Sequence, residues 1–190
     1  MVKRLNLVND IFLADIILII SLLIDVLIRP ESLANNSGIS YFGIFLNTLP
    51  AYVAGLSMSS YIIARFAFLK IKKYRVVRVM LIALFPFNLF LITFPYDVNR
   101  FYADVHQTFG VLIFVFELLI SLYISEKLGK IFFNRLLLSI ELISGLFSAY
   151  YLAPKNGFLM QAQIIYQIAF GLMLLVNYQQ LQNKATNLTK

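Results

Sequence analysis

The chain has 190 residues, of which 61% are hydrophobic and 13% are charged, and its mean hydropathy is +0.82. A chain this apolar cannot cover a single core with a water-soluble surface, so a soluble globular protein is excluded and lipid must be part of its solvent. The net charge of +7 comes from Lys and Arg beside apolar segments, which suits anionic lipid headgroups and argues against nucleic acid as a partner. Because there is no Cys and one His, thiolate and three-His metal sites are excluded; a mixed carboxylate and His site stays open, and no cofactor is predicted.

Six apolar segments follow one another along the chain, each with roughly the 20 residues needed to cross a ~30 Å hydrocarbon layer. They lie near residues 9–28, 41–67, 76–95, 105–124, 133–152 and 159–181. We expect the first to be retained, because it carries Asp15 and Asp25 and no small-residue cleavage motif follows it. The connections are short, so the sequence predicts an all-α fold, a six-helix transmembrane bundle that forms one domain over residues 1–190.

The positive charges alternate between the two ends of these segments. One set of ends collects thirteen Lys and Arg, at positions 3, 4, 65, 70, 72, 73, 75, 78, 127, 130, 135, 184 and 190. The other set has three: Arg29, Arg100 and Lys155. Cytoplasmic ends carry the excess of Lys and Arg, so this bias predicts a multi-pass protein of the cytoplasmic (plasma) membrane with both termini in the cytoplasm.

Small residues and prolines mark sites of close packing and of bending. Ala51, Gly55 and Ser59 recur every four residues on the second segment, a spacing typical of helices that pack closely in membranes. Pro50 and Pro86 lie inside apolar segments, where each removes a backbone hydrogen bond, so we expect both to kink their helices.

Three carboxylates lie inside the apolar segments at a similar depth from the cytoplasmic boundary. They are Asp15, Glu117 and Glu141, in the first, fourth and fifth segments. Three carboxylates that share a dry site cannot all stay ionised, so such a site would hold a proton or bind a cation. The alternative is that each is neutral and hydrogen-bonded to a neighbouring helix, or is paired with Arg65.

A second polar group is expected toward the outer side. Its members are Asp25, Asn47, Asn88, Asp97, Asp104, His106, Gln163 and Gln167. His106 and Glu117 are eleven residues apart, almost three helical turns, so they share one helix face, as do Gln163 and Gln167 one turn apart. We interpret these faces as the lining of a polar pocket that opens outward and binds a ligand.

Enzyme chemistry has a narrow basis in this sequence. Asp97, Asp104 and His106 could form an acid and base pair for a membrane-embedded enzyme that modifies lipids. There is no nucleophile elbow, no HExxH motif and no phosphate-binding glycine loop, so the sequence favours a non-enzymatic protein.

The stretch from Pro86 to Glu126 carries Phe94-Pro95-Tyr96-Asp97, followed by His106 and Gly110. This pattern resembles that of a family of small bacterial six-helix membrane proteins, the domain of unknown function nine-nine-eight, which is distantly similar to Frag-like and DRAM-like proteins. The resemblance implies Pro95, Asp97, His106 and Gly110 as the matching positions and supports a six-helix architecture.

The function predicted from the sequence is the binding or transport of a small molecule or lipid through the outward-facing pocket. The second hypothesis is the lipid-modifying enzyme, and a third is the substrate-binding subunit of an importer, which would need a partner subunit. A structural or immunity-type protein with no ligand is the remaining alternative. In each case we expect membrane lipids as partners, with anionic headgroups at the cytoplasmic face.

Overall fold

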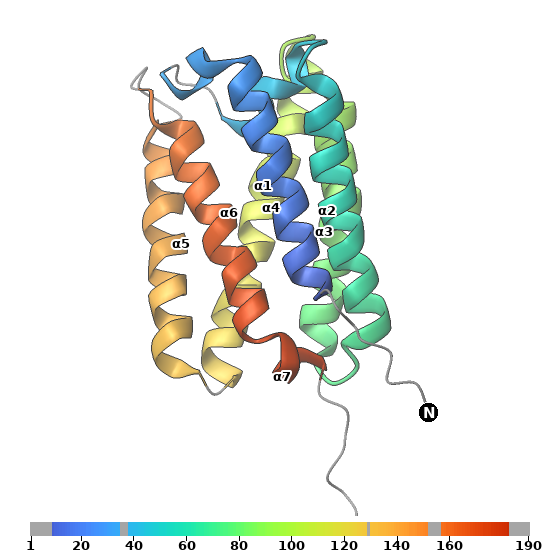
Figure 1. Ribbon diagram of the computed structural model, residues 1–190, viewed down its shortest axis with the longest axis vertical. Coiled ribbons are helices and arrows are strands. Elements are labelled where there is room, and N and C mark those ends of the chain that lie inside the picture. Colours follow the sequence, from blue (N-terminus) through green and yellow to red (C-terminus); the bar gives the residue numbers. More distant parts are fainter. Residues whose placement is uncertain (1–8, 35–37, 129, 152–156, 183–190) are drawn as a thin grey trace, which may run out of the picture.

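The fold is an all-helical bundle in a computed structural model that describes residues 9–34, 38–128, 130–151 and 157–182 (Figure 1). Within these residues, six helices are long and apolar enough to cross a membrane, which confirms the predicted fold class. The long helices are α1 (Asp10–Ile28), α2 (Leu49–Lys70), α3 (Arg75–Thr93), α4 (Arg100–Lys127), α5 (Ile131–Tyr151) and α6 (Leu159–Val176). Three short helices join them: the 3₁₀ helices η1 (Pro30–Leu33) and η2 (Ile39–Ile44), and α7 (Tyr178–Gln182).

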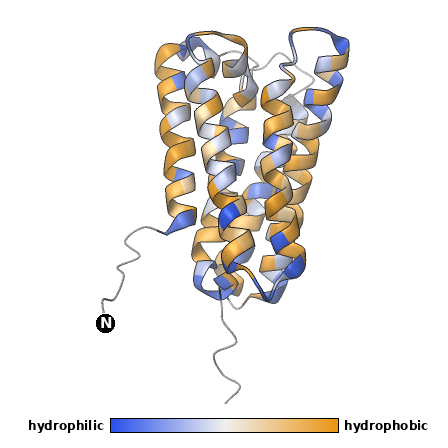
Figure 2. Cartoon of the chain, turned by 90° about the vertical axis from the view of Figure 1, so that its right-hand side faces the viewer, coloured by the Kyte–Doolittle hydropathy of each residue, from blue (hydrophilic) through white to orange (hydrophobic). Residues whose placement is uncertain are grey.

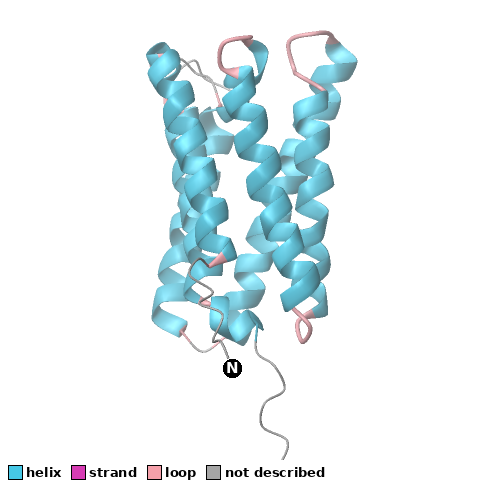
Figure 3. Cartoon of the chain, turned by 45° about the vertical axis from the view of Figure 1, so that its right-hand side comes forward, coloured by secondary structure: helices cyan, strands magenta, loops and turns pink. Residues whose placement is uncertain are grey.

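The helices run up and down and close into a ring. Each long helix packs against the next one along the chain, and α6 returns to pack against α1 as well as α4. Helix α6 is more buried than α3: half of its 18-residue apolar window is buried inside the protein, compared with 17% for α3. Loops lie only at the two ends of the bundle (Figure 3).

We call the end with the α2–α3 and α4–α5 connections the basic end, and the end with η1, η2 and the α3–α4 connection the opposite end. Helix α1 begins and α7 ends at the basic end (Figure 1). Of the Lys and Arg residues that the structure describes, nine lie toward the basic end: Arg65, Lys70, Lys72, Lys73, Arg75, Arg78, Lys127, Lys130 and Arg135. Arg29 and Arg100 lie at the opposite end, and Lys3, Arg4, Lys155, Lys184 and Lys190 are outside the described residues.

Hydrophobic residues predominate along the long helices (Figure 2), and large apolar side chains lie on the outside of the bundle as well as in its core. The core is built around fully buried Phe66, Leu81, Ile120 and Met173. Large apolar side chains such as Leu27, 80% exposed, and Leu146, 71% exposed, lie along the outer helix faces. A single chain in water would not expose so much apolar surface, so these faces are the ones that lipid covers.

Close packing between α1 and α2 follows the predicted stripe of small residues. Gly55 lies directly against the side chain of Ser21, so no larger residue fits there without moving α1. Ser59 on the same stripe is buried as well. Small side chains therefore let the two helices approach each other closely, as expected for helices in a membrane.

The start of the second helix was wrong in the sequence prediction. Residues 41–44 belong to η2, and α2 begins only at Leu49. Pro50 is in the first turn of α2, where its missing N–H removes no helical hydrogen bond, so it starts the helix and does not kink it. Pro86, in contrast, lies inside α3 as predicted.

The sixth predicted segment, residues 159–181, divides at Asn177 into α6 and α7. Asn177 Nδ2 donates to Asn134 Oδ1 on α5 at 2.8 Å and to the Met173 carbonyl at 2.9 Å. Both Asn side chains are fully buried. This pair joins the beginning of α5 to the end of α6.

Candidate functional site

A pair of buried glutamates occupies the region where α4, α5 and α6 meet. Glu117 on α4 is 4% exposed, and Glu141 on α5 is fully buried. Gln167 Nε2 on α6 donates to Glu117 Oε2 at 2.9 Å. Ser121, one turn beyond Glu117 on α4, donates to Glu141 Oε1 at 2.8 Å. The Glu141 carboxyl group on α5 therefore meets α4 one turn beyond Glu117, on the same face of α4.

The second oxygen of Glu141 differs in its surroundings from the two carboxyl oxygens of this pair that accept from Gln167 and Ser121. Glu141 Oε2 is buried and has no hydrogen-bond partner among the described residues. Tyr166 on α6 is close to both carboxyl groups, but its hydroxyl donates to the Phe114 carbonyl at 2.8 Å. Glu141 Oε2 is thus a buried polar atom left available for a proton or a ligand.

Asp15 on α1, the third carboxylate predicted at this depth, contacts α6 at a different position, Gly171. A methyl group added at Gly171 would come within 2.5 Å of Asp15 Oδ1, so the carboxylate lies directly against the α6 backbone in the seam between α1 and α6. Within the described part of the chain, no group of three or more His, Cys, Asp or Glu could hold a metal ion. The structure therefore brings together two of the three carboxylates.

Among the residues that the structure describes, no Lys, Arg or His forms an ion pair with Glu117 or Glu141. The two ion pairs between described residues are Arg29–Glu31 and Lys70–Asp10, at opposite ends of the bundle. Arg65, the partner considered from the sequence, is on the exposed side of α2 and forms neither of these pairs. The immediate partners of the two glutamates are thus a neutral amide and a neutral hydroxyl.

The opposite end uses its predicted polar residues mainly to fix the backbone. Gln163 Oε1 accepts from the Ile39 amide at 2.8 Å, at the start of η2. Gln161 Nε2, in the same turn of α6, donates to the Leu33 carbonyl at 2.7 Å, at the end of η1. These two bonds clamp the α1–α2 connection onto α6, so Gln163 and Gln167 have different partners although they are one turn apart.

His106 joins α4 to the end of α3. Its Nδ1 is 2.9 Å from the Phe94 carbonyl and 3.1 Å from the Leu91 carbonyl, and because both are acceptors, Nδ1 carries the hydrogen. His106 is 8% exposed, with the ring of Tyr96 edge-on at 5.5 Å. The buried positions of His106 and Glu117 confirm that they share the inward face of α4.

The remaining polar residues of this end do not gather around His106. Asn47, Asp97 and Asp104 are exposed. Asn88 Nδ2 donates to the Leu84 carbonyl one turn earlier in its own helix, at 2.9 Å. These four residues are thus either exposed or bonded within their own helix, and their part in an outward-facing pocket stays a prediction.

Asp25 is the exception at this end. It is fully buried in the last turn of α1, and neither of its carboxyl oxygens has a hydrogen-bond partner among the described residues. Tyr52 on α2 is also buried, and its hydroxyl likewise has no hydrogen-bond partner among the described residues. Ser32 Oγ and Gln161 Oε1, at the same end of the bundle, are also buried without a partner. Polar atoms in this condition are candidates for contacts with water or a ligand.

Several contributors to these regions were not predicted from the sequence, among them Ser121, Asn134, Asn177 and Gln161. Ser121 is one turn from Glu117, and this spacing was the signal that could have placed it beside the carboxylates. Asn134 and Asn177 are far apart in the chain, and nothing in the sequence pairs them.

The fold and the buried acidic residues define the class of the molecule: a multi-pass membrane protein with six candidate spanning helices. No family model, curated protein or solved structure matches the chain. The resemblance of the stretch from Pro86 to Glu126 to the domain of unknown function nine-nine-eight therefore stays a prediction.

Proposed function

We propose that the protein is a transporter of the bacterial cytoplasmic membrane, which moves a small molecule or lipid and exchanges a proton at the Glu117–Glu141 pair. In this proposal both termini are cytoplasmic, so the basic end faces the cytoplasm and the opposite end faces outward. The excess of Lys and Arg at the basic end supports that orientation.

The observation that carries the proposal is the glutamate pair without a basic partner. Burying a single charge at the centre of a bilayer costs about 2.5–3.5 kcal/mol on insertion scales, and two adjacent negative charges also repel each other. The pair is therefore most stable when at least one carboxyl group is protonated. A site that holds one or two protons, with one oxygen unpaired, is suited to releasing and taking up a proton as the bundle changes shape.

Asp25 supplies the ligand-binding part of the proposal. Its unpaired oxygens lie near the outward mouth of the bundle, with the buried oxygens of Ser32 and Gln161 at the same end. These groups are hydrogen-bond acceptors or, in the case of the Ser hydroxyl, both donor and acceptor. A small molecule with amino or hydroxyl groups has the matching chemistry.

The lipid-modifying enzyme is less well supported by the geometry. An outward-facing base at His106 would have to work with Asp97 and Asp104, but those two side chains are exposed while His106 is buried. The Nδ1 of His106 already binds two carbonyls of α3. Transport therefore remains the proposed function.

Proton flux into vesicles tests the role of the pair directly. The purified protein would be reconstituted into liposomes that contain a pH-sensitive dye, and a potassium diffusion potential would drive protons inward. We expect Glu117→Gln and Glu141→Gln each to reduce the rate at least tenfold, because the amide cannot exchange a proton but keeps the size and hydrogen bonding of the side chain.

Glu126→Gln is the matched control, since Glu126 is on the same helix but is exposed at the basic end. It should leave the flux unchanged. Wild-type vesicles with no flux above that of empty liposomes, or variants of both buried glutamates that conduct like wild type, would reject the proton-exchange role. The pair would then be a neutral hydrogen-bonded link between helices.

A further inference from the structure

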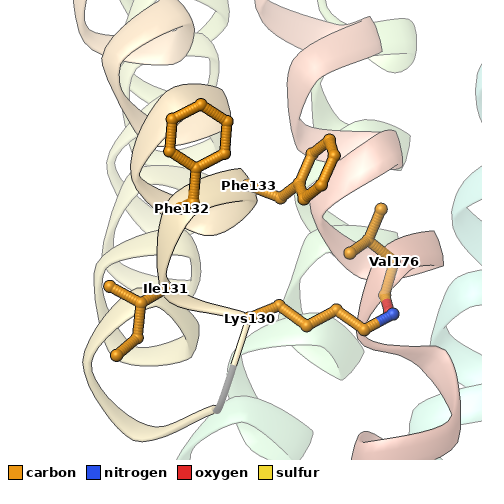
Figure 4. A pocket seen from close by; sticks show the side chains of 5 residues that line it. All are labelled: Lys130, Ile131, Phe132, Phe133 and Val176. Atoms are coloured by element: carbon orange, nitrogen blue, oxygen red, sulfur yellow. The ribbon is translucent and has the colours of Figure 1, made fainter.

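A cleft of about 600 Å³ opens on the outside of the bundle, at the basic end, between the beginning of α5 and the end of α6 (Figure 4). Its lining residues are Lys130, Ile131, Phe132, Phe133 and Val176. The three apolar residues at the start of α5 are strongly exposed: Ile131 by 55%, Phe132 by 73% and Phe133 by 57%. None of these residues belongs to the proposed proton or ligand sites.

The position of the cleft along the bundle matches the boundary between lipid tails and headgroups. Helix α5 begins at Ile131 and α6 ends at Val176, so the cleft is at the limit of two spanning helices. Side chains that are apolar and aromatic are stable at this depth when lipid covers them, and the described part of the chain leaves Phe132 and Phe133 exposed. The lining of the cleft is thus apolar except for Lys130, whose ammonium group is basic.

Lys130 places a positive charge across the mouth of the cleft. Its Nζ donates to the Val176 carbonyl at 2.9 Å (Figure 4), and an ammonium group has two further hydrogens to donate. Lys127 and Arg135, close to Lys130 in the sequence, are also exposed at this end of the bundle, and Glu126 is the acidic residue nearest in sequence. This end of the bundle is therefore net positive, which favours an anionic group.

Two sets of hydrogen bonds connect the two helices that form the walls of the cleft, α5 and α6. The Asn134–Asn177 pair, fully buried, joins the first turn of α5 to the end of α6. The bond from Lys130 to Val176 joins the same two segments at the surface. A cleft between elements fixed in this way keeps its shape without a ligand, which lowers the entropic cost of binding.

We propose that this cleft binds one anionic phospholipid of the leaflet at the basic end, with the phosphate at Lys130 and an acyl chain against Phe133 and Val176. The charge of Lys130 selects the headgroup, and the apolar wall accepts the chain. A water-soluble anion would leave the exposed phenylalanines uncovered, so a lipid satisfies more of the surface. This assignment does not depend on proton exchange at the glutamate pair.

Native mass spectrometry of the full chain in detergent micelles tests the assignment. The protein would be titrated with phosphatidylglycerol and, separately, with phosphatidylcholine of the same acyl chains. We expect one phosphatidylglycerol to bind more tightly than phosphatidylcholine, and Lys130→Gln to weaken that first site about fivefold, since one Lys near an anionic headgroup contributes roughly 1 kcal/mol.

Lys127→Gln removes a charge at this end of the bundle but not the one inside the cleft, so it should change the affinity by less than about twofold. Lys130→Arg keeps the charge and should retain binding, which separates loss of charge from loss of fold. Equal affinity for the two lipids, or equal losses in the Lys127 and Lys130 variants, would overturn the proposal, because the binding would then be a general property of the basic surface. Phe133→Ala should weaken both lipids alike.

Discussion

Two polar regions of the bundle differ in the hydrogen-bond partners of their buried side chains. Between α4, α5 and α6, the side chains of Glu117 and Glu141 are bonded to other side chains. At the opposite end, His106 and Gln163 are bonded to backbone groups, at the end of α3 and at the start of η2. The first arrangement can change its protonation without unfolding a backbone segment, whereas the second holds chain connections in place.

This difference separates residues that can exchange a proton from residues that hold the backbone in place. A carboxyl group with neutral partners can lose or gain a proton while its partners rotate. A backbone amide or carbonyl that loses its partner stays buried and unsatisfied, which costs about 1–3 kcal/mol. Polarity and depth alone do not distinguish the two kinds of site, but the identity of the hydrogen-bond partner does.

The largest effect on stability is expected for His106→Ala. The change removes a buried ring and leaves the Leu91 and Phe94 carbonyls without their side-chain donor, so we expect a loss of about 2–3 kcal/mol in the free energy of unfolding. Reversible unfolding in mixed micelles, followed by circular dichroism, measures it.

Asp104→Ala, two residues earlier on the exposed side of α4, is the control and should change the unfolding free energy by less than about 0.5 kcal/mol. If His106→Ala proved as stable as wild type while an outward-facing activity disappeared, the supporting role of this histidine would be wrong. The enzyme hypothesis would then regain its base.

A smaller effect is expected for Gln163→Ala. The Ile39 amide loses its acceptor, so the clamp on the α1–α2 connection opens, at a cost of about 1–2 kcal/mol. Hydrogen exchange should become faster in η2, near residues 39–44, and stay unchanged in the middle of α4. Gln107→Ala, at an exposed position of α4, should leave both regions as they are.

The six long helices and the inward face of α4 could be predicted from the sequence. Apolar length predicts where each helix crosses, and the eleven-residue spacing of His106 and Glu117 places both on one face, because that spacing is close to three turns. The exceptions were the break of the sixth segment at Asn177 and the start of α2. Residues 41–48 are apolar enough to continue a span, but Pro50 favours a first turn, and η2 takes up the preceding residues.

The partners of the polar residues could not be predicted in the same way. Depth in the membrane follows from position in a helix, so Asp15, Glu117 and Glu141 were expected at one level. Which of them meet depends on which helices are neighbours and on how each is rotated, and this is decided by packing. Gly171 gives Asp15 room in the seam between α1 and α6, apart from the glutamate pair.

The smallest effect is expected for Ser121→Ala, which probes the glutamate pair without touching a carboxyl group. The change removes the donor to Glu141 Oε1, so neither oxygen of Glu141 then has a hydrogen-bond partner among the described residues. Hydrogen bonds between membrane helices contribute on average about 0.6 kcal/mol and at most about 1.7, so we expect a loss of about 1 kcal/mol. If Glu141 is the group that holds the proton, its carbonyl stretching band in the infrared spectrum should move to higher frequency, because a hydrogen bond to that carbonyl is lost.

The control is Ser139→Ala. The Ser139 hydroxyl donates to the Arg135 carbonyl of its own helix, so this change should alter neither the unfolding free energy by a comparable amount nor the position of the band. A band that stays in place in Ser121→Ala but disappears in Glu117→Gln would assign the proton to Glu117, and the Gln167 amide would then be the group that stabilises the protonated form.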